Sequence, residues 1–340
     1  MNPNRLRSAG VVMALCLAAL ASPAQGAKPA SPAAPSPPAH DYSKDEVHVL
    51  PVQGNIFMLV GAGGNITVQA GDQGVLLVDT GVAPMSEKVL AAIRSISTRP
   101  LRYIINTHVH ADHTGGNATI AKAGMTIAGG NVVGDIGASA SNQAAVIAYQ
   151  SVLDRMSAPT SGGERATAQD SWPTETFTTP ERHIFFNGEG VQMIHVPAAH
   201  TDGDTLVFFR RSDVISTGDL FVTTSYPIVD LSRGGNIQGV LAGLNKIIDL
   251  AIPAELQEGG TLIIPGHGRL CDVADVVFYQ EMVTIVRDRV QDLINKHQTL
   301  EQVKAARPTL DYDPRYGATS GFWTTDKFVE AVYKSLSEKH

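Results

Sequence analysis

Four residues that can bind a metal ion lie within six positions of the chain: His108, His110, Asp112 and His113. His108 and His110 are two residues apart and follow the apolar segment 103–105, so an extended chain places both side chains on one side. Imidazole and carboxylate groups suit zinc, and also iron or manganese. This density of ligand types predicts a metal centre rather than a polar turn.

Three further candidate ligands lie at the carboxyl end of an apolar, strand-like segment or in the turn after it: His200, Asp219 and His267. Loops gather at the ends of strands, and functional sites are commonly built there. Together with the first cluster they make five histidines and two aspartates. That number is enough for two metal ions with one bridging group.

Apolar runs punctuated by glycine and proline predict the elements that position these residues. We expect strands at 56–60, 66–70, 75–78, 103–105, 183–186, 191–195, 205–209, 214–217 and 262–264. We expect helices at 84–97, 117–123, 132–156, 237–250 and 273–297, and a long loop at 157–180. Strands followed by helices in each half predict an α/β fold in which two packed sheets are covered by helices.

The amino terminus is predicted to be a targeting segment rather than part of the folded domain. Residues 1–26 have a basic start, an apolar run at 9–20 and a small-x-small pattern at 24–26, as in a signal peptide. An uncleaved membrane anchor is the alternative. Residues 27–46 are predicted to be a Pro/Ala-rich linker and 47–340 the folded domain. Cleavage would leave a periplasmic or secreted protein without a stable membrane anchor.

The overall composition excludes several classes of protein. The 340 residues are 43% hydrophobic and carry a formal net charge of −7, which is typical of a globular chain. The acidic balance argues against a nucleic-acid partner. The expected partner is a small-molecule substrate. The two cysteines, Cys16 and Cys271, are too few for a disulfide framework or a cysteine-only zinc site. The oligomeric state is not predicted.

The H-x-H-x-D-H pattern at 108–113, followed in order by His200, Asp219 and His267, resembles the metallo-β-lactamase-fold hydrolase superfamily. The resemblance extends from about residue 47 to at least residue 272. It implies a four-layer αββα sandwich with two mixed β-sheets and two Zn²⁺ ions at one edge, iron or manganese being possible instead.

The resemblance also implies a role for each ligand. His108, His110 and His200 would bind the first zinc, whereas Asp112, His113 and His267 would bind the second, with Asp219 bridging both. Asp79, at the end of the segment 75–78, is expected to support the ligand loop rather than to bind metal directly.

The implied activity is hydrolysis of an ester, thioester, lactone or amide-type bond by a metal-activated hydroxide. Asp112 is expected to be catalytic, because it could orient the nucleophile or carry its proton. Tyr226, Arg233 and Asn236 follow Asp219 in a Gly-rich stretch and are candidates for orienting the substrate.

Other activities stay open at this point. β-Lactam ring opening is the main alternative, although a large subclass of zinc β-lactamases has cysteine in place of Asp219 and lysine in place of Val222. An iron-dependent sulfur dioxygenase and a non-catalytic binding module are further alternatives. All seven ligand positions are filled, which disfavours the binding module.

Overall fold

The computed structural model describes residues 40–125, 143–159, 166–257 and 259–337. The predicted signal peptide at 1–26 lies outside these residues, as does most of the predicted linker at 27–46. Among the described residues, no helix is both long and apolar enough to cross a membrane. The described chain starts with a short 3-10 turn, η1 (Tyr42–Lys44), just before the first strand.

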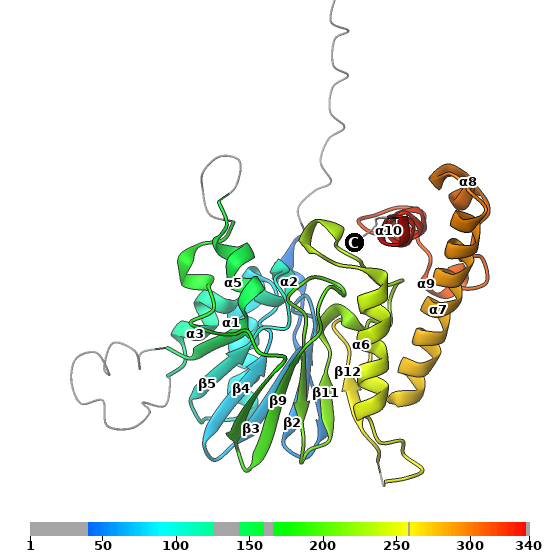
Figure 1. Cartoon of the computed structure of the whole chain (residues 1–340). Helices are drawn as coiled ribbons and strands as arrows, with labels where there is room; N and C mark the ends of the chain where they lie inside the picture. Colours follow the sequence, from blue (N-terminus) through cyan, green and yellow to red (C-terminus); the bar gives the residue numbers. More distant parts are fainter. Residues whose placement is uncertain (1–39, 126–142, 160–165, 258, 338–340) are drawn as a thin grey trace, which may run out of the picture. The chain divides into compact units, whose positions relative to one another are not determined.

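Seven strands form the first sheet in the order in which they occur along the chain (Figure 1): β1 (His48–Gln53), β2 (Ile56–Val60), β3 (Ile66–Gly71), β4 (Gly74–Val78), β5 (Leu101–Ile105), β6 (Ala145–Tyr149) and β7 (Glu175–Phe177). Strands β1 to β4 are antiparallel neighbours, whereas β4 to β7 run parallel. Every residue of β4 is buried, as expected for an uninterrupted apolar strand covered on both faces.

The second sheet has five strands in the spatial order β12-β11-β10-β9-β8. Their bounds are β8 (Glu181–Phe186), β9 (Glu189–His195), β10 (Thr205–Phe209), β11 (Val214–Ser216) and β12 (Leu262–Ile264). Strands β8 to β11 form an antiparallel meander, and β12 joins β11 in parallel after the crossover helix α6 (Ile237–Leu250). Both sheets are therefore mixed.

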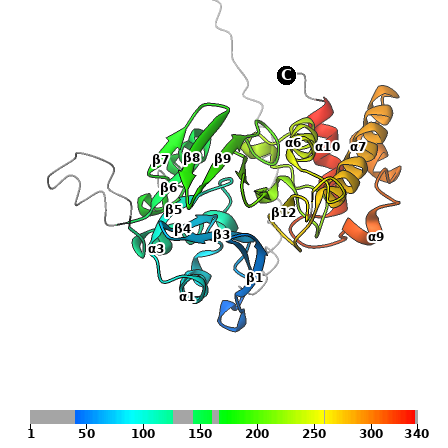
Figure 2. The same cartoon turned by 90° about the horizontal axis from the view of Figure 1, so that it is seen from below.

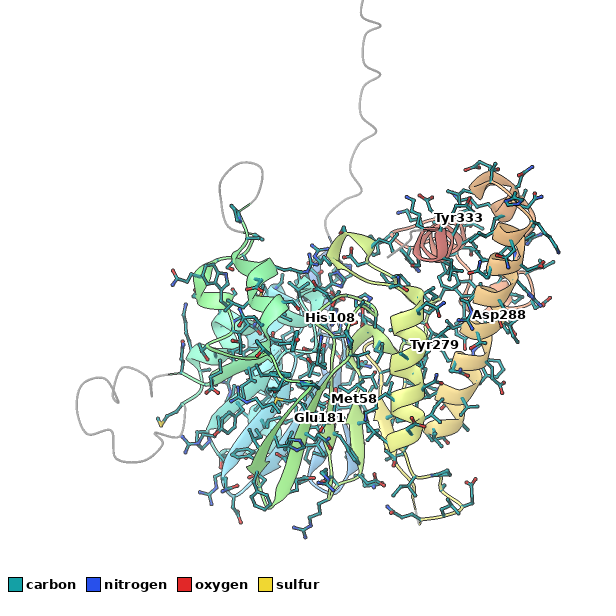
Figure 3. The ribbon with its side chains drawn as sticks, viewed as in Figure 1. Met58, His108, Glu181, Tyr279, Asp288 and Tyr333 are labelled. Atoms are coloured by element: carbon teal, nitrogen blue, oxygen red, sulfur yellow. The ribbon has the colours of Figure 1, made fainter. Side chains whose placement is uncertain are left out.

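The two sheets face each other across an apolar core, and helices cover their outer faces (Figures 1 and 2). Met58 of β2 lies between the sheets, whereas His108 lies at their upper edge in Figure 3. Helix α1 (Ser86–Ile96) packs on the first sheet, and α6 and α7 (Val273–Asn295) pack on the second. The predicted αββα sandwich with two mixed β-sheets is confirmed.

The carboxyl-terminal segment adds helices that the sequence reasoning did not predict. They are α8 (Leu300–Ala305), α9 (Asp313–Tyr316) and α10 (Thr325–Ser337). Phe328 of α10 stacks on Tyr226 with the ring centroids 4.6 Å apart. The amide of Ile237, the first residue of α6, donates to the hydroxyl of Ser335 in α10. These contacts fix α10 against the layer of helices that covers the second sheet.

The predicted helix at 132–156 is wrong at 145–149 and confirmed at 150–156, whereas its part before residue 143 lies outside the described residues. Residues 145–149 form strand β6, and only then does helix α5 (Gln150–Ser157) begin. Strand β6 pairs in parallel with β5 and β7, so the sheet satisfies its backbone groups on both sides. This pairing overrides the helix propensity of its alanines. The predicted loop at 157–180 likewise contains β7, at 175–177.

Candidate metal centre

The structure brings the predicted ligands together at one edge of the sandwich, where strands of both sheets end. His108 and His110 follow β5, and Asp112 and His113 lie in the short helix α2 (Ala111–Thr114). The second sheet supplies the other three from the loops after β9, β11 and β12: His200, Asp219 and His267.

Backbone contacts between the two sheets hold these loops together. The amide of Thr205 donates to the carbonyl of Thr107 at 2.9 Å, next to His108. The amide of Asn65 donates to the carbonyl of Gly266 at 2.7 Å, next to His267. These bonds set the distance between ligands that lie far apart in the sequence.

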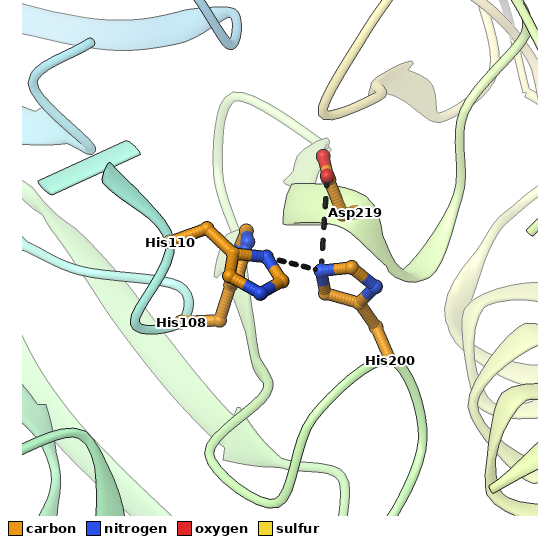
Figure 4. A group of neighbouring side chains, drawn as sticks. All are labelled: His108, His110, His200 and Asp219. Atoms are coloured by element: carbon orange, nitrogen blue, oxygen red, sulfur yellow. Dashed lines mark hydrogen bonds and ion pairs between the residues drawn. The ribbon is translucent and has the colours of Figure 1, made fainter. Parts of the chain in front are cut away.

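The first group of ligands comprises His108, His110, His200 and Asp219, whose ligand atoms all lie within 4.8 Å of one another (Figure 4). His110 Nδ1 lies 2.9 Å from His200 Nε2. Asp219 Oδ2 lies 3.8 Å from the same His200 nitrogen. All four side chains therefore point at one small volume.

The second group comprises Asp112, His113, Asp219 and His267, again with all ligand atoms within 4.8 Å of one another. Asp219 Oδ1 lies 3.1 Å from His113 Nε2 and 3.5 Å from His267 Nε2. The other oxygen of Asp219 faces the first group. One carboxylate, that of Asp219, thus belongs to both groups of possible ligands.

Three buried polar atoms of this centre have no hydrogen-bond partner among the described residues: His108 Nε2, His113 Nε2 and Asp219 Oδ1. An unpaired buried polar atom costs about 1–3 kcal/mol, so native proteins rarely retain one without a reason. A cation among these atoms would satisfy all three. The residues present therefore fit divalent metal ions, and imidazole with carboxylate is a donor set compatible with zinc, iron or manganese.

In His110, His113 and His200, the imidazole nitrogen that faces away from the centre lies within hydrogen-bond distance of an oxygen acceptor. His113 Nδ1 lies 2.8 Å from Asp79 Oδ2, and His110 Nε2 lies 2.9 Å from Asp230 Oδ2. His200 Nδ1 lies 2.6 Å from the Ile228 carbonyl oxygen. Each acceptor favours the tautomer with a proton on that outer nitrogen, so the inner nitrogen keeps its lone pair for a metal.

Asp79 lies behind the ligands and belongs to neither group. It is buried, and its backbone has a φ of 65°, a left-handed conformation that short polar residues tolerate. Its carboxylate accepts from the amide of Thr107 at 2.8 Å and from the Thr107 hydroxyl at 2.7 Å, as well as contacting His113. Asp79 therefore fixes the loop that carries His108 to His113.

Glycine is required at two positions that touch the ligands. A Cβ on Gly64 would lie 2.4 Å from Cε1 of His113, and a Cβ on Gly266 would lie 2.1 Å from Oδ1 of Asp219. Neither ligand can move without leaving its group. Gly266, which precedes His267 in the sequence, thus leaves the space that the Asp219 carboxylate occupies.

The electrostatics of the centre differ between the two groups. Burial lowers the pKa of His108 well below its usual value and lowers that of His200 to about 4, so both imidazoles are neutral at neutral pH. Burial acts in the same direction on His113, but the carboxylates of Asp219 and Asp79 outweigh it and raise the pKa of this histidine. The metal-free second group therefore holds a proton that a metal must displace.

A cavity of about 970 Å³ opens from the centre toward α10. His110, Asp112, Asp219 and His267 lie at one side of it. The rest of the lining is mostly apolar and includes Val222, Ile228, Leu231, Phe322, Trp323 and Ala331. A small molecule could reach both ligand groups through this cavity.

The three predicted substrate-orienting residues have different positions. Arg233 lines the cavity, but its guanidinium lies 2.6 Å from the Asp230 carboxylate. Tyr226 is buried, and its hydroxyl lies 2.9 Å from Oδ1 of Asp313. Asn236 caps α6 by accepting from the amide of Gln238. Tyr226 and Asn236 thus lie outside the cavity lining, in packing and capping positions.

Sequence reasoning missed two sets of residues at this site. Asp230, whose carboxylate contacts His110, was not singled out, although it lies in the same Gly-rich stretch as Tyr226, Arg233 and Asn236. The cavity wall from Phe322 to Lys334 lies beyond the last predicted helix. Its amphipathic spacing, with buried Phe328, Val329 and Val332, is the signal that could have revealed it.

A metal centre at the edge of an αββα sandwich defines the class of protein, and comparison with known families agrees. The profile described as the Metallo-beta-lactamase superfamily matches residues 59–267. This match covers more than half of the chain. The chain belongs to the metallo-beta-lactamase superfamily, as the sequence motif predicted.

Individual relatives are more distant. A linear primary-alkylsulfatase of Pseudomonas sp. (strain ATCC 19151) is 24% identical over 274 residues, which cover 71% of this chain and 50% of the relative. The chain thus spans about half the length of this relative.

Solved structures of two kinds resemble the fold. The sec-alkylsulfatase Pisa1 from Pseudomonas sp. superposes with a TM-score of 0.61 at 15% identity, covering 85% of this chain and 50% of that one. The DIM-1 metallo-beta-lactamase superposes with a TM-score of 0.51 at 17% identity, and the match covers 70% of this chain and 97% of that one. At these identities the likeness establishes the fold alone.

Proposed function

We propose that this protein is an exported hydrolase with two zinc ions, which cleaves an ester, thioester, lactone or amide-type bond of a small molecule. The observation that carries the proposal is the shared carboxylate of Asp219, with one oxygen toward each ligand group, beside a cavity large enough for a substrate. Export rests on the signal-like sequence at 1–26.

When bound, the two ions would supply Lewis acidity and lower the pKa of water. The chain itself supplies the proton acceptor. The Asp112 side chain is 39% exposed and lines the cavity, and its Oδ2 lies 3.1 Å from His267 Nε2. Burial tends to raise the pKa of Asp112, but hydrogen bonding to His267 and the nearby His113 lower it overall. Asp112 is therefore ionised at neutral pH, so it can take a proton from the attacking water and pass it to the leaving group.

Sulfate esters are a second candidate substrate class, because the curated relative and one of the solved structures are alkylsulfatases. The alkylsulfatase structure also covers a larger share of this chain than the β-lactamase does. β-Lactams remain the third candidate. Val222 lines the cavity three residues after Asp219 and offers no charge to a substrate carboxylate.

The test combines metal quantification with a substrate panel on the purified mature chain. We expect about two zinc ions per chain and turnover of at least one carboxylic ester, thioester, lactone or amide. Turnover of alkyl sulfates or of a cephalosporin alone would favour the second or third candidate. One iron without zinc, or no hydrolysis of any compound by the zinc-loaded chain, would refute the proposal. Cell fractionation tests the export.

A further inference from the structure

Helix α10 presents one face to the cavity, opposite the metal centre. Lys327, Glu330, Ala331 and Lys334 all line it, at the i, i+3, i+4 and i+7 spacing of a single helical face. The other side of the helix is anchored by Phe328, which stacks on Tyr226. This wall lies beyond residues 59–267, which match the superfamily profile.

Two of the three cations that line the cavity are neutralised within the protein. The Arg233 guanidinium lies 2.6 Å from Asp230. Lys334 Nζ lies 2.7 Å from Oε1 of Glu330, whose other oxygen accepts from Lys304 at 2.9 Å. Hydrogen bonds from Lys334 and Lys304 lower the pKa of Glu330 to about 2, so its carboxylate is ionised and paired with both lysines. Asp230 and Glu330 are thus each already paired with another cation, and neither lies within ion-pair distance of Lys327 among the described residues.

Lys327 is the remaining cation. Within the described part of the chain, no carboxylate lies within ion-pair distance of its Nζ. That atom donates one hydrogen bond, at 2.6 Å, to the carbonyl of Phe322, and lies 5.7 Å from the centroid of the Phe322 ring. An ammonium group has three donors, so two stay available for a ligand. Its bond to Phe322 also restrains the flexible lysine stem at the cavity wall.

Apolar side chains line the cavity together with the metal centre and Lys327. They are Val222, Ile228, Leu231, Phe322 and Ala331. The hydroxyl residues Thr224, Ser225 and Ser232 and the Trp323 indole also line the cavity, but most of the lining surface is apolar. A ligand that fills this space therefore needs a largely apolar middle. Its end toward α10 would gain most from a negative charge, since one lysine there lacks an anion.

We propose that Lys327 binds a carboxylate at the end of the substrate that lies away from the bond to be cleaved. The substrate class is an acyl compound with an apolar chain and a terminal carboxylate. This inference rests on the proposed hydrolase function, in which the cleaved bond lies at the metal centre. It adds a specificity-determining residue outside the metal ligands.

The test measures binding, so that it does not depend on turnover. Unbranched dicarboxylates from pentanedioate to decanedioate, and monocarboxylates of the same lengths, are titrated into the zinc-loaded full chain by calorimetry. In the unmodified chain we expect at least one dicarboxylate to bind about tenfold more tightly than its monocarboxylate, because of one additional charge-assisted hydrogen bond. K327Q should abolish that preference, and K327R should retain most of it.

K334Q is the matched control, because it removes the same charge from the same helix face but from a lysine that is already paired. It should keep the preference for the dicarboxylate. The proposal is wrong if the unmodified chain shows no preference, if K327Q keeps it, or if K334Q loses as much as K327Q. The two proposals can fail separately. If K327Q loses the preference but the unmodified chain hydrolyses no compound of the panel, the proposed hydrolase function is refuted, whereas Lys327 stays a carboxylate-binding residue.

Discussion

Replacing Asp79 with asparagine tests how the chain fixes its metal ligands. The substitution keeps the size of the side chain but removes its charge. In the native chain the carboxylate accepts from the Thr107 amide, the Thr107 hydroxyl and His113 Nδ1. An asparagine oxygen can keep the bond from the amide. Its NH₂ group would then face the other two partners, which are donors in the native arrangement.

The expected loss can be derived from these contacts. To accept from the new NH₂ group, His113 must move its proton to Nε2, the nitrogen that faces Asp219 and the metal position. Removal of an acceptor behind a metal-binding histidine typically costs 10–100-fold in metal affinity, or about 1.4–2.8 kcal/mol. We expect the second metal to be lost first, since the first group touches Asp79 only through Thr107.

The assay is zinc titration against a competing chelator, with thermal unfolding of the metal-free chain in parallel. Asp213→Asn is the matched control. Asp213 is also buried and left-handed, with a φ of 54°. It accepts from the Thr261 hydroxyl at 2.8 Å and from Gln257 at 2.9 Å, and contacts no metal ligand. Both variants lose a buried carboxylate, so both should destabilise the fold by about 1–3 kcal/mol.

Only Asp79→Asn should lower the affinity for zinc. Equal zinc affinity in Asp79→Asn and the native chain would refute the assignment of His113 Nε2 as the ligand atom. A matching loss in Asp213→Asn would show that general destabilisation, rather than ligand orientation, governs metal binding.

Three further predictions concern the ligands themselves. Asp112→Ala should abolish turnover and weaken the second metal, because it removes both a ligand and the proton acceptor; a near-normal kcat, measured with saturating zinc, would contradict the mechanism. His200→Ala should lower occupancy of the first site by at least about tenfold, and metal content equal to that of the native chain would exclude His200 as a ligand. The pKa of His113 is raised, so this imidazole carries a proton near neutral pH that zinc must displace, whereas His108 and His200 carry none. Zinc affinity of the second site should therefore rise with pH wherever this proton is bound, by up to about tenfold per pH unit, while that of the first site changes less. Calorimetry in two buffers should detect a proton released as zinc binds the second site, and a pH-independent second site would contradict this prediction.

The candidate ligands were predictable because each one follows directly on an apolar strand. Strand β12 and helix α6 have the predicted bounds, since their apolar patterns end at clear breaks. The chain also folds so that one carboxylate is shared between two groups of ligands. The order of the ligands along the chain made the family resemblance recognisable, and the resemblance in turn implied which residue is shared.

The rest of the site depends on contacts that no local pattern encodes. Strand β6 has two alanines among three strand-forming residues, so its local pattern is ambiguous, and its two parallel neighbours make it a strand. From the sequence, Tyr226 and Arg233 were equal candidates for binding a substrate. In the structure the Tyr226 hydroxyl donates to Asp313, and the Arg233 guanidinium forms an ion pair with Asp230. Tertiary partners decide whether a polar side chain is free to bind a ligand. The cavity wall of α10 comes from a segment more than 50 residues beyond His267.

The first sheet is complete in sequence order by Phe177, before any strand of the second sheet has been made. A growing chain would therefore expose His108 to His113 without the residues that close either ligand group. Each group takes two residues from loops of the first sheet and two from loops of the second. Separating the sheets must break both groups at once, so bound metal adds its free energy to their docking, about 2.7 kcal/mol at a concentration of 100 times Kd. Metal uptake at either group therefore requires both halves of the sandwich, and its rate in a refolding experiment would report when the two halves meet.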